Sequence, residues 1–367
     1  MSAPPADHRP PPSLNHGYNR RVAAALDEVL AQTRAAGAAL DFDLSRDRYI
    51  LFSDQHRGAR NRADDFVRCE RAYNAALAYY YKLGHTLVVL GDVEELWKES
   101  PAAVLRHYAH TVALEADFHR AGRYLRFWGN HDDAWGETEN VAWFLEPAYG
   151  GPLAVYEGLL LNVVDQGESL GTLFLIHGHQ GDPSSDQWSR LARLAVRYVW
   201  RPIQRLTGIS NNTPAQDWQL RQKQNIALYA WAQARSRLVL IAGHTHRPVF
   251  RSRTYAEQVR HILGELEARL AQAADDRRLR ELVGDFAAEL EWARAQDFQS
   301  PGNEGEAMPM HKPCYFNTGC CSFVDGDITG LELAGGEVRL VRWPDKHGRP
   351  RPQVLASASL REVLAQC

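Results

Sequence analysis

The sequence predicts an α/β protein built around a mainly parallel sheet. Short apolar runs typical of buried strands alternate with longer segments whose apolar residues recur at helical spacing. Several of these apolar runs are followed at once by glycine, aspartate, asparagine or histidine. Ligands of open parallel sheets bind beyond the carboxyl ends of the strands, so we expect these polar residues to meet in one place.

The overall composition is that of an ordinary globular protein. The chain has 367 residues and a formal net charge of −3, so it can bury a large core and has no general attraction to nucleic acid or anionic membranes. The N-terminus lacks the apolar segment of a signal peptide, and no run approaches the ~18 apolar residues of a membrane span. The five cysteines follow no C-x-x-C spacing. We therefore expect a cytoplasmic protein.

The first half of the chain alternates between strands and helices after a proline-rich start. Residues 1–17 are expected to be a disordered tail because their prolines leave no apolar face. The periodicity then predicts helices over 20–36, 62–82 and 101–121, and strands over 49–53, 86–90 and 123–128. The order strand, helix, strand favours parallel pairing.

The second half is expected to complete one domain and to carry two helical insertions. Strands are predicted over 159–164, 172–176, 329–333 and 338–343, together with an apolar strand that begins at Leu238. Helices are predicted over 186–206 and 213–235, and two charged amphipathic helices form a hairpin insertion over 254–296. The expected organisation is a single domain over 18–344 with a helical cap over 184–236, followed by a C-terminal tail over 345–367.

Seven potential metal ligands lie at the expected strand ends. Two histidines separated by one residue, as in the stretch LVLIAGHTHRP, point to the same side of extended backbone. Such a pair alone fits a polar loop equally well, so a metal site depends on what converges with it. The strand ends together present Asp54, His56, Asp92, Asn130, His177, His244 and His246.

This donor set is too rich for one ion. Two divalent metals about 3.5 to 4 Å apart, bridged by one carboxylate and a water, would use all seven groups. Mixed carboxylate, amide and imidazole ligands suit Mn, Fe or Zn and disfavour Ca, which prefers oxygen alone. We expect Mn first, with Fe or Zn as alternatives.

The ordered set of motifs resembles the calcineurin-like metallophosphoesterases. The chain carries D-x-H at 54–56, G-D-x-x-E at 91–95, G-N-H-D at 129–132, a later histidine, and G-H-x-H at 243–246. The resemblance covers about 49–250 and resumes at Asn317-Thr318-Gly319. It implies a four-layer α/β/β/α sandwich of two packed mixed sheets flanked by helices, with helical insertions.

The resemblance also implies a role for each residue of the motifs. The first metal would be held by Asp54, His56 and His246, the second by Asn130, His177 and His244, with Asp92 as the bridge. The implied activity is hydrolysis of a phosphate monoester or diester by in-line attack of a metal-bridging hydroxide.

Three residues beside the ligands are candidates for the chemistry. The resemblance makes His131 the catalytic histidine, which steadies the attacking oxygen or protonates the leaving one. Asp132 is expected to support His131 or a ligand histidine. Arg57 would meet negative charge that develops on the phosphoryl group. A salt bridge from Arg57 to Asp64 or Asp65 is an equally good interpretation.

Other assignments near the motifs stay open. His177 and His179 compete for one ligand position, and His177 is preferred because it lies nearer the end of its strand. Glu95 is expected to orient its loop rather than to bind metal. Trp97 and Trp135 either line a substrate pocket or, as the more common role for tryptophan, pack in the core.

The substrate is indicated by the helix predicted over 186–206. Its basic stripe consists of Arg190, Arg193, Arg197, Arg201 and Arg205. The stripe is either a solvated helix face or a cap that attracts an anionic or lipid-linked phosphate, with peripheral contact at the inner face of a membrane. Nucleic acid is not an expected partner, because the chain shows no extended basic pattern.

Two alternative functions follow from the same motifs. UDP-2,3-diacylglucosamine pyrophosphatases resemble the chain in a G-D-x-x-E-x-W motif, matched here by 91–97. Their third motif reads G-N-R-D, whereas this chain has G-N-H-D at 129–132, so this activity is the second choice. A non-catalytic scaffold is the third, although such proteins usually lose ligands that are all present here.

Overall fold

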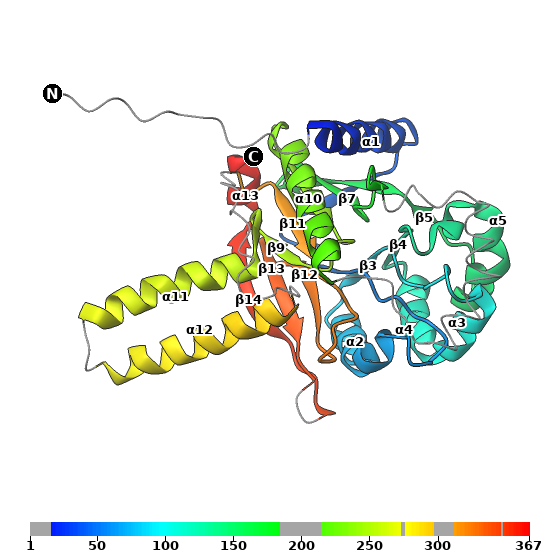
Figure 1. Ribbon diagram of the computed structural model, residues 1–367. Coiled ribbons are helices and arrows are strands. Elements are labelled where there is room, and N and C mark those ends of the chain that lie inside the picture. Colours follow the sequence, from blue (N-terminus) through cyan, green and yellow to red (C-terminus); the bar gives the residue numbers. More distant parts are fainter. Residues whose placement is uncertain (1–15, 184–213, 273–275, 297–311, 346–347) are drawn as a thin grey trace.

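The computed structural model contains two seven-stranded sheets that pack face to face (Figure 1). It describes residues 16–183, 214–272, 276–296, 312–345 and 348–367. Helices lie on the outer face of each sheet. The expected four-layer α/β/β/α sandwich of two mixed sheets is confirmed.

The first sheet contains the three strands predicted for the first half of the chain. Its order is β14-β13-β12-β2-β3-β4-β5. The parallel half comprises β2 (Tyr49–Phe52), β3 (Thr86–Leu90), β4 (Tyr124–Phe127) and β5 (Val155–Tyr156). The antiparallel half comprises β12 (Ile328–Ala334), β13 (Glu337–Trp343) and β14 (Gln353–Ser359).

The second sheet has the order β1-β6-β7-β8-β11-β9-β10. Its strands are β1 (Ala39–Asp43), β6 (Gly158–Asp165), β7 (Glu168–Ile176), β8 (Leu238–Ala242), β9 (Pro248–Phe250), β10 (Arg253–Thr254) and β11 (Tyr315–Thr318). The central strands β7, β8 and β11 run parallel. Their carboxyl ends therefore lie at one edge, as those of β2, β3 and β4 do in the other sheet.

Alternation along the strands explains the layers. On β2, Leu51 belongs to the core between the two sheets, whereas Ile50 and Phe52 pack on the other side with α2 (Phe66–Lys82). Successive strand side chains point to opposite faces, so a short apolar run serves both layers. The outer helices are α2, α3 (Pro101–His107) and α4 (Ala109–Arg120) on the first sheet, and α1 (His16–Ala35) and α10 (Pro214–Gln233) on the second.

The structure differs from the sequence prediction in the middle of the chain and at both ends. The helix predicted over 101–121 is interrupted at Tyr108, and short helices follow as η1 (Asp133–Gly136), α5 (Thr138–Asn140), η2 (Val141–Leu145) and α6 (Glu146–Tyr149). Helix α1 begins at His16, inside the expected tail. The sequence analysis expected only a tail near the C-terminus, but β14 pairs with β13 there, and α13 (Leu360–Gln366) buries Val363 and Leu364.

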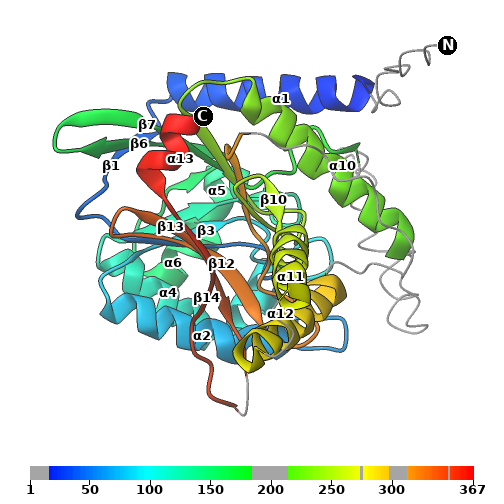
Figure 2. The ribbon, with the colours of Figure 1, turned by 90° about the vertical axis from the view of Figure 1, so that its left-hand side faces the viewer.

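The expected helical hairpin is present as α11 (Tyr255–Gln272) and α12 (Arg277–Gln296). The two helices pack on each other and extend away from the sheets (Figures 1 and 2). The helix expected over 186–206, with its arginine stripe, falls outside the described residues. In the described ranges, no helix combines the length and apolarity needed to cross a membrane.

Candidate metal centre

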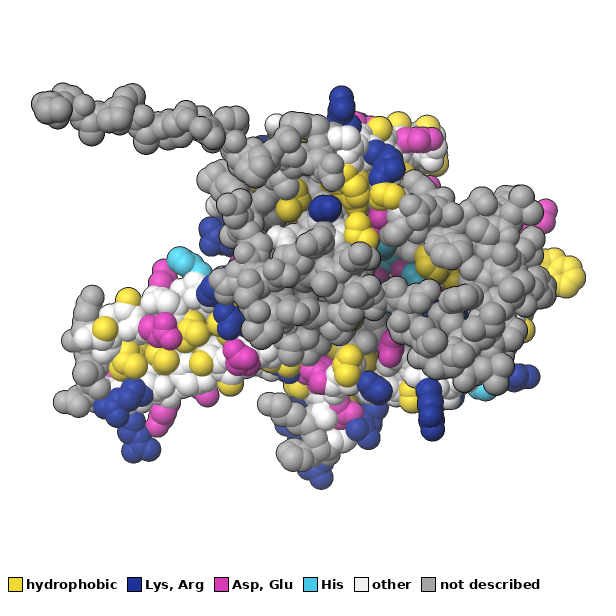
Figure 3. Space-filling model, viewed as in Figure 1, with side chains coloured by type: hydrophobic (Ala, Val, Ile, Leu, Met, Phe, Trp, Pro, Cys, Tyr) yellow, Lys and Arg dark blue, Asp and Glu magenta, His cyan; other side chains and the backbone are white. Residues whose placement is uncertain are grey.

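Five strands deliver their following residues to one place between the sheets. Asp54 and His56 follow β2, Asp92 follows β3, and Asn130 follows β4. From the second sheet, His177 follows β7, and His244 and His246 follow β8. Figure 3 shows histidine and acidic side chains side by side near the middle of one face, bordered by hydrophobic side chains.

Five of the seven predicted ligands have left-handed backbone conformations. The φ angles are 56° at Asp54, 50° at His56, 52° at Asp92, 67° at His244 and 58° at His246. Residues with a Cβ atom rarely adopt this conformation, which costs of the order of 1 kcal/mol or more each. Such strain is concentrated at functional sites, where it aims a side chain in a direction that regular backbone does not allow.

Glycines in three of the motifs let the loops approach closely. A Cβ atom at Gly129 would lie 2.3 Å from Asp92 Oδ1, and one at Gly243 would lie 2.7 Å from Asp54 Oδ2. At Gly91 it would lie 2.9 Å from His177 Nδ1. These distances are too short for any side chain, so the glycine beside each ligand is a packing requirement of the cluster.

The first group of donors consists of Asp54, His56 and His246, whose ligand atoms lie within 4.8 Å of one another. The Nε2 atoms of His56 and His246 are 3.0 Å apart, and Asp54 Oδ1 lies 3.3 Å from His246 Nε2. The other carboxylate oxygen of Asp54 accepts hydrogen bonds from the Ser53 hydroxyl and the His244 backbone amide. The Asp54 carboxylate is thus held with one oxygen facing the histidines.

The second group consists of Asp92, His177 and His244. Asp92 Oδ2 lies 3.2 Å from His177 Nε2 and 3.8 Å from His56 Nε2. His177 donates from Nδ1 to the Leu90 carbonyl at 2.6 Å, which leaves its Nε2 lone pair facing Asp92 when the ring is neutral. Asp92 Oδ2 therefore lies between His56 of the first group and His177 of the second.

Unpartnered buried atoms show that these residues fit metal ions. Among the described residues, Asp54 Oδ1, Asn130 Oδ1 and His177 Nε2 are buried without a hydrogen-bond partner. Buried polar atoms are nearly always hydrogen-bonded, and each unsatisfied atom costs about 1–3 kcal/mol. Three such atoms in one cluster of oxygen and nitrogen donors are explained by coordination to a cation.

The pKa values of Asp92 and His177 also fit a cation at this place. Burial opposes charge on Asp92 and on His177, but their attraction outweighs it. The pKa of Asp92 lies well below its usual value, and the pKa of His177 rises to about 9. A proton on His177 thus balances the buried carboxylate, and a divalent cation between the two would replace that proton.

His131 is held by two side chains that the sequence left open. Its Nδ1 atom lies 3.0 Å from both carboxylate oxygens of Glu95, and its ring stacks on Trp97 with the centroids 3.8 Å apart. Burial lowers the pKa of His131, but the Glu95 carboxylate raises it above its usual value. Glu95 therefore orients the His131 ring as well as its own loop, and the ring also lies beside His56 and Asp92.

Asp132 has a different task from the one expected. Its carboxylate accepts hydrogen bonds from the backbone amides of Asp92, Val93 and Gly129. It contacts Arg126 at 3.5 Å and is fully buried. Asp132 therefore ties the loops after β3 and β4 together through backbone amides, whereas the sequence analysis expected it to support His131 or a ligand histidine.

Arg57 does not reach the cluster, which corrects its expected role. The side chain is fully buried and forms an ion pair with Glu115 of α4. Backbone hydrogen bonds join Arg57 to Val93 and Glu95, so its side chain points away from His56 toward α2 and α4. The alternative partner Asp64 instead accepts from the Tyr108 hydroxyl and the Arg60 amide.

Two further groups support the histidines of the second sheet. Asp182 Oδ2 lies 3.0 Å from His244 Nε2, so a proton on Nε2 leaves Nδ1 free for a cation. Asn317 donates to the Gly243 carbonyl at 2.6 Å and fixes the turn that carries His244. The sequence offered the Asn-Thr-Gly motif as a signal for Asn317, whereas nothing in the local pattern distinguished Asp182.

The remaining candidates have structural surroundings. His179 packs against His177 and over Trp128, but belongs to none of the three donor groups found in the described part of the chain. Trp135 is buried and donates to Glu94 at 2.9 Å. The geometry thus favours His177 over His179 as a ligand and gives Trp135 a packing role.

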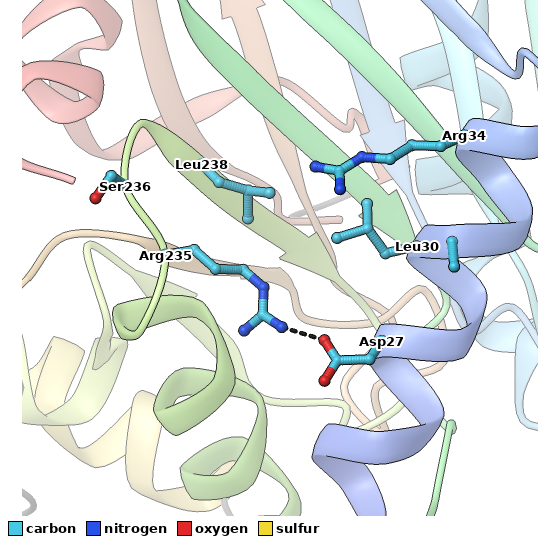
Figure 4. Close-up of a pocket in the computed structure, with 7 residues that line it drawn as sticks. Asp27, Leu30, Arg34, Arg235, Ser236 and Leu238 are labelled. Carbon is cyan, nitrogen blue, oxygen red and sulfur yellow. Dashed lines mark hydrogen bonds and ion pairs between the residues drawn. The ribbon is translucent and has the colours of Figure 1, made fainter.

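A cavity of about 350 Å³ lies outside the metal centre, between α1 and the start of β8. Figure 4 shows Arg235 paired with Asp27 across it, with Arg34 and Leu30 on the α1 side. Its lining residues include none of the candidate ligands. It is therefore separate from the site described above.

No family model matches the sequence, and no curated protein matches it. Among solved structures, vacuolar protein sorting 29 from Cryptosporidium parvum aligns over 85% of this chain and 98% of its own, with 12% identity and a TM-score of 0.34. A dimetal phosphatase from Danio rerio aligns over 84% and 99%, with 12% identity and a TM-score of 0.33. At this level of similarity, function has to be inferred from the chain's own side chains.

Proposed function

We propose that the chain is a hydrolase of phosphate esters that uses two divalent metal ions. The observation that carries the proposal is the place of Asp92, whose Oδ2 lies 3.2 Å from His177 and 3.8 Å from His56. A carboxylate between two histidine-rich groups is suited to bridge two ions, and two-metal sites are typical of phosphoryl chemistry. Asp54, His56 and His246 would hold one ion, and Asn130, His177 and His244 the other.

The two ions, when bound, supply Lewis-acid chemistry and activate a water molecule at neutral pH. The side chains of the protein do the rest. His131 is positioned by Glu95 at Nδ1, which leaves Nε2 to donate a proton to the oxygen of the leaving group. Asp132 keeps the loops of Asp92 and His131 in register through the amides it binds.

The proposal is tested with generic substrates. We expect the purified protein, supplied with Mn²⁺, to hydrolyse p-nitrophenyl phosphate or its bis-ester. Activity should collapse in Asp92→Asn and His131→Ala, with Asp92→Asn also losing metal. A protein that binds two ions yet hydrolyses no phosphoester would support the scaffold alternative. A protein that binds no metal and stays inactive would overturn both the site and the function.

The physiological substrate is proposed to be an anionic or lipid-linked phosphoester. The support is the arginine stripe in the sequence of 186–206, which lies outside the described residues. A screen should include monoesters, cyclic and linear diesters, nucleotide pyrophosphates and UDP-diacylglucosamine. Selective loss of activity on the lipid substrate in Arg193→Ala/Arg197→Ala/Arg201→Ala would support the lipid pyrophosphatase alternative, and unchanged activity on every substrate would remove it.

A further inference from the structure

Helix α10 presents two adjacent buried amides to the loops that carry three of the proposed ligands. The helix lies beside α1 and packs on β8 and β11 (Figures 1 and 2). Gln224 and Asn225 lie in its middle, and both residues are buried. A buried amide has to find hydrogen-bond partners, so those partners show which segments the helix holds in place.

Gln224 holds the loop after β7. Its Nε2 atom donates to the Gly178 carbonyl at 2.7 Å and to the Gln180 carbonyl at 3.3 Å. Both carbonyls lie between the proposed ligand His177 and Asp182, the partner of a ligand histidine described above. The two ends of this loop are thus fixed relative to α10 through one side chain.

The Gln224 amide is itself held in one orientation by α1. The Tyr18 hydroxyl donates to Gln224 Oε1 at 2.7 Å, so the oxygen faces α1 and the nitrogen faces the loop. The same helix touches the loop directly, because a Cβ atom at Gly181 would lie 2.6 Å from Val22 Cα. Loss of the amide would leave two loop carbonyls without this donor.

Asn225 holds the loop after β8 in the same way. Its Oδ1 atom accepts hydrogen bonds from the Thr245 hydroxyl at 3.1 Å and from the Tyr315 hydroxyl at 2.7 Å. Thr245 stands between the proposed ligands His244 and His246. Adjacent residues of α10 therefore hold the two loops through which the second sheet supplies histidines to the metal centre.

We propose that Gln224 and Asn225 are positioning residues of the metal centre, an inference that rests on the proposed two-metal function. Gln224 sets the place of His177 and so acts on the ion of Asn130, His177 and His244, the second ion. Asn225 acts on both ions, because the loop it holds supplies one histidine to each. Groups that orient metal ligands change metal affinity by about 10–100-fold when they are replaced.

Calorimetric titration of the apoprotein with Mn²⁺ tests the role of Gln224. Gln224→Met keeps an unbranched side chain but removes the amide, and it should weaken the second ion at least tenfold while the first ion binds as before. Combination with His246→Ala, which removes a donor of the first ion, should leave one weakened ion. Combination with Asn130→Ala, which removes a donor of the second, should leave one ion of unchanged affinity.

A glutamine elsewhere in the chain provides a matched control. Gln258 also donates to two backbone carbonyls, those of Phe250 at 2.9 Å and Arg253 at 3.1 Å, but it holds the turn between β9 and β10. Gln258→Met should therefore keep both Mn²⁺ affinities. Tyr18→Phe, which removes only the hydroxyl that orients Gln224, should weaken the second ion by a smaller factor and remains informative if Gln224→Met folds poorly.

The two ions give the test a readout that general loosening of the fold does not imitate. Asn225→Leu should weaken both ions, whereas Gln224→Met should weaken one. Equal affinities in Gln224→Met and Gln258→Met, or an equal loss for both ions in Gln224→Met, would overturn the inference. A selective loss of the second ion in a chain that hydrolyses no phosphoester would support the inference and overturn the proposed function alone. An unmodified chain that binds no Mn²⁺ would overturn both.

Discussion

Nδ1 of His131 lies 3.0 Å from both carboxylate oxygens of Glu95. Trp97 stacks on the ring, and the Glu95 carboxylate accepts a hydrogen bond from Nδ1 and favours the protonated imidazole, whose Nε2 can then donate. A residue three positions after the proposed bridging Asp92 thus positions the group proposed to protonate the leaving oxygen.

Glu95→Gln is expected to lower kcat by tenfold or more, because the amide retains the shape of the side chain but loses the charge that favours protonated His131. Metal content should be unchanged, since Glu95 is a positioning residue and not a proposed ligand. Steady-state kinetics with p-nitrophenyl phosphate and elemental analysis check both points. Glu139→Gln, which changes an exposed carboxylate of α5, is the control. Equal kcat values in the two variants would contradict the role of Glu95.

Gly243→Ala is expected to weaken metal binding because the added Cβ atom would lie 2.7 Å from Asp54 Oδ2 and 2.4 Å from Ser53 Oγ. Isothermal titration with Mn²⁺ should show at least a tenfold loss in affinity at the site of Asp54. Gly264→Ala in α11 is the control, because nothing lies within 4 Å of its Cβ position. Unchanged affinity in Gly243→Ala would mean that the loop does not need this close approach.

Glu115→Leu is expected to destabilise the fold by about 3–5 kcal/mol, because it leaves the buried Arg57 without its main partner. Tyr73 and Tyr149 also donate to Glu115, at 2.8 and 2.5 Å, and would lose an acceptor. Urea unfolding measures the loss. Arg57→Met combined with Glu115→Leu should recover part of it, since no unpaired charge stays buried. A cost below about 1 kcal/mol in the single variant would contradict a structural role for the pair.

The sequence identified the site through features that are local in the chain. Each proposed ligand follows an apolar strand, and parallel strands bring their carboxyl ends together, so Asp54, Asp92 and His177 could be placed without knowing the fold in detail. Strand patterns do not show which sheet a strand joins. The two packed sheets were therefore expected only from the resemblance of the motifs to a known family.

Side-chain direction was not predictable in the same way. Arg57 and His56 are neighbours in one motif, yet His56 faces the proposed ligands and Arg57 turns to Glu115, because backbone contacts to Val93 and Glu95 set its direction. Asp132 binds backbone amides from two loops, a long-range contact without a sequence signal. The C-terminal strand β14 was missed because its residues are only partly buried and lack a clear apolar alternation.

The number of metal ions tests the central claim most directly. Apoprotein titrated with Mn²⁺ in a calorimeter should bind about two equivalents per chain, as two donor groups with Asp92 between them require. His246→Ala, which removes a donor from the first group alone, should bind about one equivalent under the same conditions. Binding of two equivalents by the unmodified chain and one by the variant is the predicted result. Binding of one ion or none by the unmodified chain would contradict the two-metal centre.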